Sequence, residues 1–385
     1  MYNFSKLAER KNTTSYKWDN TKSQLPMNIA DMDFMCAPEI IDSLRKRVEI
    51  GAYGYSIIPD ELFLAYKDYE YRNHNIKYDT KDMIFSLGVV PSISTIVRAL
   101  TNPRERIIIL TPNYSIFFNS IYNNGRIIVE CPLDYKDSKY SINFKLLEEE
   151  LKNTESSMMI ISNPHNPVGL IYSKEDLEKI VDLCNKYEII LVSDEIHKDI
   201  VRKGFKYNPI FSIKNTEDNV IALMSMTKVC NMAGVSSSIV IAKNRRLKNR
   251  VERALNTDEV AEPHFFSIAP TIAALTKCDN WIKEMNEYVD ENFRIYKEYI
   301  ETNIKDIKLI DSKATYLAWI DGSKITIDSK GLCDHILEKT GLLINPGEEY
   351  GKTGEGFIRI NLATSHENVK LSLKLLKEGI ESFNK

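Results

Sequence analysis

The sequence lacks the cysteine patterns by which metal-binding and disulfide-rich proteins are recognised. Its six cysteines are scattered and form no CxxC pair. This spacing argues against a zinc site, a redox motif and a disulfide framework, so we expect no bound metal and reduced cysteines that mostly serve packing. The six are Cys36, Cys131, Cys184, Cys230, Cys278 and Cys333.

Long apolar runs and blocks of one charge are missing as well. Nothing approaches the run of about 18 apolar residues that a membrane helix needs. The opening residues MYNFSKLAERKNTTSYKW are polar and mixed in charge, unlike a secretory signal. The net charge is −3, from 51 basic and 54 acidic residues without a long basic block, which gives no electrostatic footprint for nucleic acid or an anionic membrane. We therefore expect a cytoplasmic protein with small-molecule partners.

What the 385 residues do contain is an α/β pattern. From residue 83, short apolar runs such as MIFSL, RIIIL and SMMIIS alternate with amphipathic stretches, among them a helix expected from Ser173 to Lys186. Continuous apolar runs are typical of parallel strands buried on both faces. After about residue 280 the pattern changes to a long helix through Tyr299, two strands around TYLAWID and GFIRINLAT, a helix from Leu332 to Lys339 and a final helix.

This pattern predicts an α/β protein of three parts. Residues 1–45 form an N-terminal segment that packs on the small domain. Residues 46–278 form a large domain with a mainly parallel sheet covered by helices. Residues 279–385 form a smaller α+β domain.

The motif Ser225-Met226-Thr227-Lys228 directly follows the apolar strand NVIALM. Lysine is rarely buried without a partner or a role, and a desolvated lysine has a lowered pKa that suits it to Schiff-base formation and proton transfer. A lone lysine in such a place is more often a surface residue of a polar loop, so the neighbouring motifs must decide.

A second motif, Ser193-Asp194-Glu195-Ile196-His197, follows the strand EIILV. In open α/β sheets ligands bind at the carboxyl ends of the strands, where Asp194 emerges. A carboxylate there can keep the nitrogen of a pyridine-type cofactor protonated. The alternatives are that Asp194 caps a helix and that His197 is a solvated or core histidine.

Two further turns follow apolar strands. Asn163-Pro164-His165-Asn166-Pro167-Val168-Gly169 forces an irregular turn, from which the Asn166 side chain can offer a hydrogen bond to a ring oxygen. Alone it is an ordinary turn, and only the other motifs make it specific. Gly88-Val89-Val90-Pro91 opens a helix whose unpaired amides suit a phosphate, although it is neither a GxGxxG nor a Walker sequence. Tyr114, after Thr111-Pro112, is a candidate to stack on a cofactor ring, or is ordinary packing.

Arg359 lies inside the otherwise apolar strand GFIRIN. A buried arginine needs a carboxylate, and its fork suits bidentate binding of a substrate α-carboxylate. A structural ion pair with one of the many Asp or Glu residues explains the position equally well.

In this order, these elements resemble a fold-type I enzyme dependent on pyridoxal 5'-phosphate (PLP), of the class I/II aminotransferase superfamily, over nearly the whole chain. Within it the sequence is most similar to the MalY/PatB-like branch of cystathionine β-lyases, or C-S lyases. The motifs that carry the narrower resemblance are Ala30-Asp31-Met32-Asp33-Phe34, Tyr53-Gly54-Tyr55, Gly88-Val89-Val90-Pro91, the Asn163 to Gly169 turn, Ser193 to His197, and Thr315-Tyr316-Leu317-Ala318-Trp319.

The resemblance implies a role for each candidate residue. Lys228 carries the cofactor and acts as acid and base, and Asp194 pairs with the ring nitrogen. The other implied cofactor contacts are Gly88, Val89, Val90, Tyr114, Asn166, His197, Ser225 and Thr227. The implied substrate contacts are Arg359, Asp31, Tyr114 and Asn166. Tyr55 reaches the phosphate of a neighbouring subunit, which implies a homodimer with shared active sites.

One departure favours the lyase branch. Many aminotransferases carry a phosphate-binding arginine eight residues after the lysine, where this chain has Ser236. We therefore predict β-elimination that releases a thiol, pyruvate and ammonia from L-cystathionine or L-cysteine. An aminotransferase, which shares every step up to removal of the α-proton, is the alternative. A non-catalytic regulatory protein that retains the fold is a more distant one.

Overall fold

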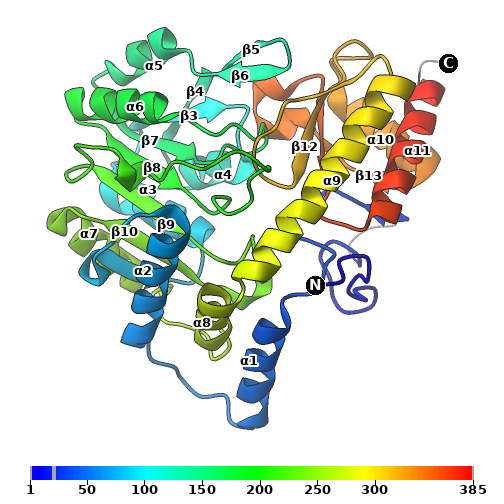
Figure 1. Cartoon of the computed structure of the whole chain (residues 1–385). Coiled ribbons are helices and arrows are strands. Elements are labelled where there is room, and N and C mark those ends of the chain that lie inside the picture. Colours follow the sequence, from blue (N-terminus) through cyan, green and yellow to red (C-terminus); the bar gives the residue numbers. More distant parts are fainter. Residues whose placement is uncertain (1, 20–22, 384–385) are drawn as a thin grey trace.

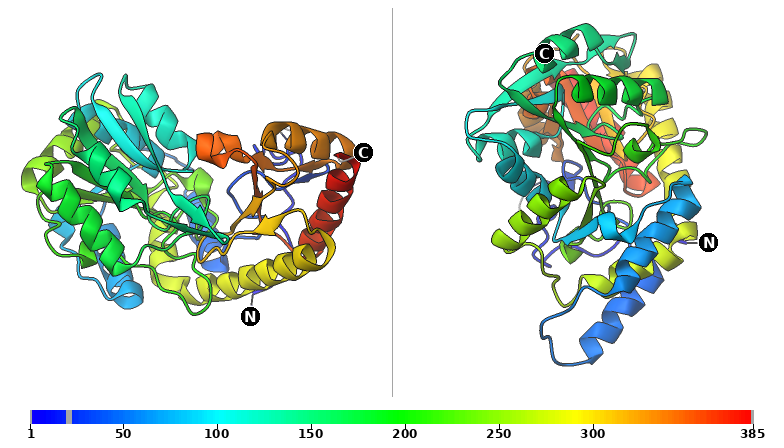
Figure 2. Two further views of the ribbon diagram at one scale, coloured as in Figure 1. Left: turned by 90° about the horizontal axis from the view of Figure 1, so that it is seen from above. Right: turned by 90° about the vertical axis from the view of Figure 1, so that its left-hand side faces the viewer.

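The computed structural model describes residues 2–19 and 23–383 and has two lobes, which lie side by side in Figure 2. The large lobe is built on a seven-stranded sheet in the order β2-β10-β9-β8-β7-β3-β4. The strands are β2 (Met83–Ser86), β3 (Arg106–Thr111), β4 (Ile127–Pro132), β7 (Ser156–Ser162), β8 (Ile190–Asp194), β9 (Val220–Met224) and β10 (Ser238–Ala242). Strand β10 pairs antiparallel with β2 and with β9, and the other four pairings are parallel, so the predicted mainly parallel sheet is confirmed.

The central strands are buried on both faces, as their apolar runs predicted. Along β3, Ile107 and Ile109 pack into one core cluster, whereas Ile108 and Leu110 pack into the other. The edge strand β4 differs, because it pairs with β3 on one side only, and its residues Ile127 and Glu130 are exposed.

Helices cover both faces of this sheet in Figure 1. They are α2 (Asp60–His74), α3 (Val89–Leu100), α4 (Ser115–Tyr122), α5 (Phe144–Leu151), α6 (Lys174–Lys186), α7 (Arg245–Thr257) and α8 (Ile268–Lys277). Ser173, where this helix was expected to begin, is the N-cap of α6: its hydroxyl accepts from the Asp176 amide, and the Asp176 carboxylate accepts from the Ser173 amide. A hairpin of β5 (Asp134–Lys136) and β6 (Lys139–Ser141) completes the lobe.

The small lobe is an antiparallel sheet in the order β11-β12-β15-β14 with helices packed on it. Its elements are α9 (Asp279–Asn303), β11 (Lys308–Leu309), β12 (Leu317–Asp321), α10 (Ser329–Thr340), β13 (Leu342–Leu343), β14 (Asn345–Pro346), β15 (Phe357–Asn361) and α11 (His366–Phe383). All three predicted helices are present: α9 ends at Asn303, four residues beyond the expected Tyr299, α10 extends past both expected ends, and α11 is the expected final helix. Figure 1 shows α9 running diagonally past α8 into this lobe.

The N-terminal segment contacts both lobes. Its short strand β1 (Leu25–Pro26) pairs with β13 of the small lobe, and Met27 O accepts a hydrogen bond from the amide of Asn361 in β15. The following helix α1 (Pro38–Glu49) packs against α8 of the large lobe. Packing of the segment on the small lobe is thus observed, while the domain boundaries at residues 45/46 and 278/279 stay predictions.

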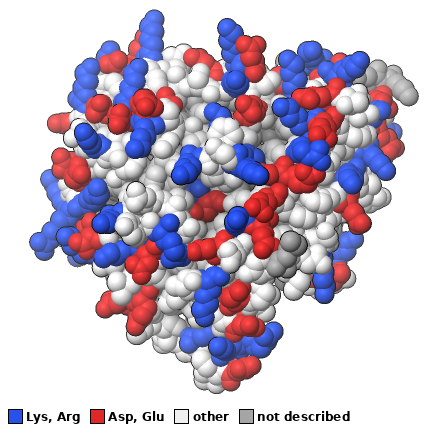
Figure 3. All heavy atoms as spheres, in the orientation of Figure 1, with Lys and Arg blue, Asp and Glu red and all other residues white. Residues whose placement is uncertain are grey.

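The surface carries both signs of charge. On the face drawn in Figure 3, Lys and Arg side chains are interspersed with Asp and Glu. Within residues 2–19 and 23–383, no helix is long and apolar enough to cross a membrane.

A buried ion pair lies inside the N-terminal segment. The Lys17 amine lies 2.8 Å from the Asp33 carboxylate, which also accepts a hydrogen bond from the indole of Trp18 at 3.1 Å. Both charged side chains are almost fully buried. Removing one partner of such a pair leaves an uncompensated buried charge.

We expect Asp33→Ala to lower the free energy of unfolding by about 3 kcal/mol, because the buried Lys17 charge then keeps only the more distant carboxylate of Asp31, 3.7 Å away. The matched control is Asp42→Ala, which removes the partner of Arg45 in a pair with both side chains exposed. That change should cost about 1 kcal/mol or less. Urea unfolding measures both, and equal losses would contradict the account.

Candidate functional site

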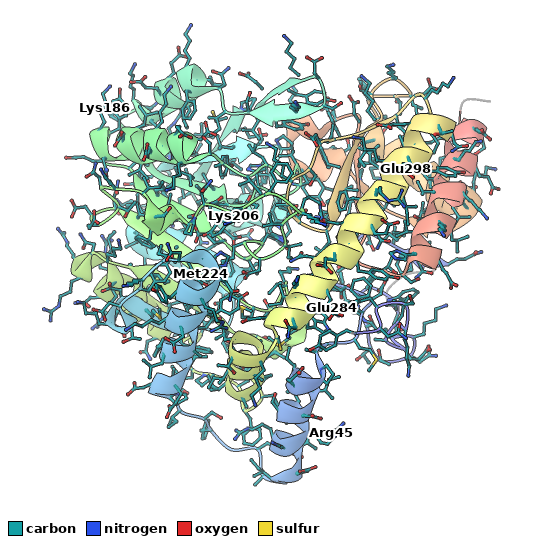
Figure 4. All side chains as sticks on the ribbon, viewed as in Figure 1. Arg45, Lys186, Lys206, Met224, Glu284 and Glu298 are labelled. Carbon is teal, nitrogen blue, oxygen red and sulfur yellow. The ribbon has the colours of Figure 1, made fainter. Side chains whose placement is uncertain are left out.

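Lys228 lies in the turn after β9, whose last residue, Met224, is labelled in Figure 4. Its Nζ donates a hydrogen bond to the carbonyl of Ala30, 2.6 Å away in the N-terminal segment. Burial lowers the pKa of the Lys228 amine to about 8, a shift that the carboxylates of Asp31 and Asp194 oppose and that Arg359 reinforces. A substantial fraction of the amine is therefore unprotonated just above neutral pH, as a nucleophile requires.

Asp194 is the last residue of β8, so the strand delivers its carboxyl to the edge of the sheet where Lys228 lies. Its Oδ1 accepts a hydrogen bond from the Ile196 amide at 3.1 Å. Burial raises the pKa of Asp194 to about 7, against the lowering effects of that amide and of the Lys228 charge. Asp194 and Lys228 are thus close enough for each to shift the pKa of the other.

Two more predicted residues present buried polar atoms without a partner. Asn166 Oδ1 and His197 Nδ1 have no hydrogen-bond partner among the described residues, although both side chains are buried. Burial, with the nearby charges of Lys228 and Arg359, lowers the pKa of His197 to about 3, so its ring is neutral. Buried atoms of this kind are expected where a ligand supplies the missing bonds.

Arg359 reaches the site from β15 of the small lobe. Its Nη2 donates to Asn28 O at 2.7 Å and to Asn345 Oδ1 at 3.1 Å, and its guanidinium lies 4.9 Å from the centre of the Tyr350 ring. The buried Nε and Nη1 have no partner in the part of the chain that the structure describes, and no Asp or Glu there lies within ion-pair distance. The structural ion pair left open by the sequence is therefore absent from the described residues.

Tyr114 lies between the two lobes' contributions to the site. Burial raises the pKa of the Tyr114 hydroxyl. The charge of Arg359 lowers this pKa and the charge of Asp194 raises it, so the side chain lies near both groups. The amide of the preceding Asn113 donates to Tyr350 O, which joins the loop after β3 to the small lobe.

The candidate phosphate-binding end of the site lies where β2 and β10 meet the turn that carries Lys228, called the lysine turn below. Gly88 precedes the first turn of α3, whose leading amides have no partner inside the helix. The Ser225 hydroxyl donates to Ser237 O at 2.6 Å and accepts from the Thr227 amide at 3.1 Å. Ser238, next in the chain, pairs with Ser86, two residues before Gly88. Valines 89 and 90 supply the amides of this helix start.

Two predicted residues are not free to act within this site. Tyr55 is fully exposed on the loop between α1 and α2. The Asp31 carboxylate already lies 2.6 Å from Arg10 Nη2 and 3.7 Å from Lys17 Nζ. The charge of Asp31 raises the pKa of Lys228. A substrate that binds Asp31, as predicted, must compete with these two cations.

Tyr316 and Asn361 are site residues whose roles the sequence did not reveal. The Tyr316 hydroxyl donates to Ala30 O at 3.0 Å, beside Lys228, and the Asn361 amide donates to the carbonyls of Ile29 and Asp31 at 2.6 and 2.5 Å. Both lie in segments already singled out as motifs. Their partners are backbone carbonyls about 300 positions away, however, and no sequence pattern marks these.

Comparison with known proteins identifies the family. Residues 22–375 match the model of the aminotransferase class I and II family. The chain belongs to this family.

Individual relatives match this chain over nearly its whole length. Cystathionine β-lyase PatB of Bacillus subtilis is 31% identical over 98% of this chain and 100% of its own length. The crystal structure of Treponema denticola cystalysin, which contains PLP, matches with a TM-score of 0.96 and 31% identity, over 99% of both chains. The PLP-bound C-S lyase of Staphylococcus hominis matches at 0.93 and 28%, over 98% of this chain and 99% of that one. The predicted family and lyase branch are confirmed.

The cofactor of this chain is pyridoxal 5'-phosphate, and the residues present fit it. Asp194 offers a carboxyl for the ring nitrogen, and the unpartnered Asn166 Oδ1 and His197 Nδ1 flank the same strand ends. The start of α3 and the Ser225 turn offer polar groups to a phosphate. The individual contacts of the predicted residues stay predictions.

In cofactor-free protein, acylation of Lys228 should rise with pH around a midpoint near 8, because only the unprotonated amine reacts. Asp194→Asn should move that midpoint lower, since the Asp194 charge raises the pKa of Lys228. Competitive acylation followed by mass spectrometry measures the pH profile of each lysine, and the exposed Lys297 serves as the internal control. A midpoint for Lys228 in the ordinary lysine range, about 10.4, would show that its amine is not desolvated.

Proposed function

We propose that this enzyme is a carbon-sulfur lyase that releases a thiol, pyruvate and ammonia from a sulfur amino acid, with L-cystathionine or L-cysteine as substrates. The proposal rests on the desolvated amine of Lys228, which lies beside Asp194. With it lies the buried guanidinium of Arg359, two of whose nitrogens have no hydrogen-bond partner among the described residues. The names of PatB and of the Staphylococcus hominis enzyme support a lyase outcome, at identities of 31% and 28%.

Each of the chain's own groups has a defined task in this reaction. When bound, PLP draws the electrons released at the substrate's α-carbon into its ring. Arg359 binds the substrate α-carboxylate and thereby sets which bond of the α-carbon is aligned for cleavage. Lys228, with a pKa near 8, accepts the α-proton. Asp194 holds the proton on the ring nitrogen, and the substrate's sulfur leaves the β-carbon as a thiolate.

An aminotransferase is the alternative, because the family includes that activity and because the same residues remove the α-proton. The two reactions diverge after that proton has been removed. A lyase expels the β-substituent, whereas an aminotransferase returns the proton to the cofactor and needs a 2-oxo acid to complete its cycle. Retention of Lys228, Asp194 and Arg359 in one site argues against a regulatory protein without catalysis.

The deciding experiment supplies L-cystathionine without any 2-oxo acid. We expect continuous release of pyruvate in amounts far above the enzyme concentration, because elimination regenerates the starting enzyme in each turnover. Coupled oxidation of NADH by lactate dehydrogenase measures it. Fast amino transfer to an added 2-oxo acid, with no pyruvate in its absence, would reject the lyase proposal.

Lys228→Ala is the control for that assay. It should abolish turnover and remove the visible absorbance band that PLP gives when bound covalently to lysine. Lys243→Ala, at a partly exposed lysine just after β10, should change neither. An unchanged spectrum in Lys228→Ala would show that another residue carries the cofactor.

We also propose that the enzyme acts as a homodimer in which Tyr55 completes the partner's phosphate site. The family typically forms dimers. Around Tyr55 the end of α1 and the loop after it expose large apolar side chains, which monomeric proteins rarely gather in one place. They are Val48, Ile50, Tyr53, Tyr55 and Ile57.

Complementation tests the shared site. Tyr55→Phe and Lys228→Ala should each lower activity, the second to background. Co-refolded mixtures should recover activity, because a mixed dimer contains one site with both Tyr55 and Lys228 intact. Turnover of the mixture against the sum of the separate variants measures this. Purely additive activity would show that Tyr55 serves its own subunit's site or none.

A further inference from the structure

The N-terminal segment lies against the site through its backbone. Four consecutive carbonyls, of residues 28 to 31, accept hydrogen bonds from side chains that converge on the site. Arg359 donates to the first at 2.7 Å and Lys228 to the third at 2.6 Å. The positions of both groups therefore depend on where this short stretch of main chain lies.

Asn231 joins that stretch to the lysine turn. Its Oδ1 accepts from the Met32 amide at 3.0 Å, and its Nδ2 donates to the carbonyls of Met32 and Phe34 at 3.1 and 2.8 Å. Its own amide donates to Lys228 O at 3.4 Å, so the residue closes the turn that carries the lysine. Oδ1 and both hydrogens of the side-chain amide are therefore used.

The backbone explains why asparagine suits this position. Residue 231 has a φ of +55°, in the left-handed region that asparagine and glycine tolerate better than other residues. Glycine would keep the backbone and remove the three side-chain bonds. Those bonds connect positions about 200 residues apart, so they determine how the segment docks rather than how the turn folds.

We propose that Asn231 is a positioning residue that holds residues 28–34 against the lysine turn, so that Ala30 O orients the Lys228 amine for proton transfer. The inference rests on the proposed role of Lys228. Lys228 depends on the segment more than Arg359 does, because Arg359 has a second anchor in Asn345 Oδ1, outside the segment. Loosening the segment therefore impairs proton transfer more than substrate binding.

The test compares Asn231→Gly with Asn215→Gly. Asn215 also has a left-handed backbone, with a φ of +60°, but its side chain is exposed on a loop of the large lobe. Both substitutions increase the freedom of the backbone by the same amount. A difference in behaviour between the two variants is therefore due to the side-chain hydrogen bonds of Asn231. Asn231→Asp is a third variant, which keeps the acceptor for the Met32 amide and loses the two donors.

Hydrogen exchange of cofactor-free protein gives a readout independent of catalysis. Amides of residues 28–34 should exchange at least about tenfold faster in Asn231→Gly and Asn231→Asp, because the segment opens more often. The acylation midpoint of Lys228 should rise toward that of an ordinary lysine, because a displaced segment admits water and burial is the largest cause of the lowered pKa. Losing the charge of Asp31, which lies in the same segment and raises that pKa, opposes this rise with a smaller effect. Asn215→Gly should match wild type in both.

Kinetics of the PLP-loaded enzyme gives the second readout. In Asn231→Gly we expect kcat to fall about tenfold or more while KM changes less, because misplacing a reacting group slows the chemical step. Asn215→Gly should keep the wild-type kcat. The substrate used is whichever amino acid the wild-type enzyme turns over, so the comparison holds for a lyase or an aminotransferase.

Either of two results would overturn the inference. One is an Asn231→Gly variant that matches Asn215→Gly in exchange, midpoint and kcat. The other is a loss of kcat with unchanged exchange of residues 28–34, which would mean that Asn231 acts without the segment. Failure of the proposed lyase function would appear in the pyruvate assay, and failure of the proposed role of Lys228 would appear in the Lys228→Ala spectrum. Both outcomes are distinguishable, since neither changes the exchange result.

Discussion

The site depends on keeping one lysine amine out of water and close to its reactive, unprotonated form. Burial lowers the pKa of Lys228 to about 8, and Arg359 pushes in the same direction. Asp194 and Asp31 oppose them and keep the shift moderate. A larger shift would leave the amine a weak base, and a smaller one would leave it protonated and unreactive at neutral pH. The surrounding structure holds these four groups in that balance.

The two lobes and the N-terminal segment each supply part of that balance. The large lobe delivers Asp194 at the end of β8 and Lys228 in the turn after β9, the small lobe delivers Arg359 on β15, and the segment supplies the carbonyl of Ala30. The site is therefore assembled from parts distant in the chain and depends on their docking. The bonds of Asn231 dock the segment on the large lobe, and the buried pair of Lys17 and Asp33 lies within the segment itself.

Much of the fold and part of the site could be predicted from the sequence, for a physical reason. Strands buried on both faces show as continuous apolar runs, and parallel strands direct their ends to one edge, so polar residues after such runs converge. That logic placed Asp194 and Asn166 together. It could not decide whether Arg359 was ion-paired, because burial and sequence position do not reveal a partner. Nor could it find the bonds of Asn231 and Tyr316, which join side chains to backbone carbonyls.

The central claim, that Lys228 carries the cofactor, is tested most directly by reduction of the PLP-loaded enzyme with borohydride, followed by peptide mass spectrometry. Reduction fixes a cofactor attached through an imine as a stable secondary amine. We expect a stoichiometric phosphopyridoxyl addition on the peptide that contains Lys228 and on no other lysine. Addition at a different lysine, or none at Lys228 in enzyme that turns over substrate, would contradict it.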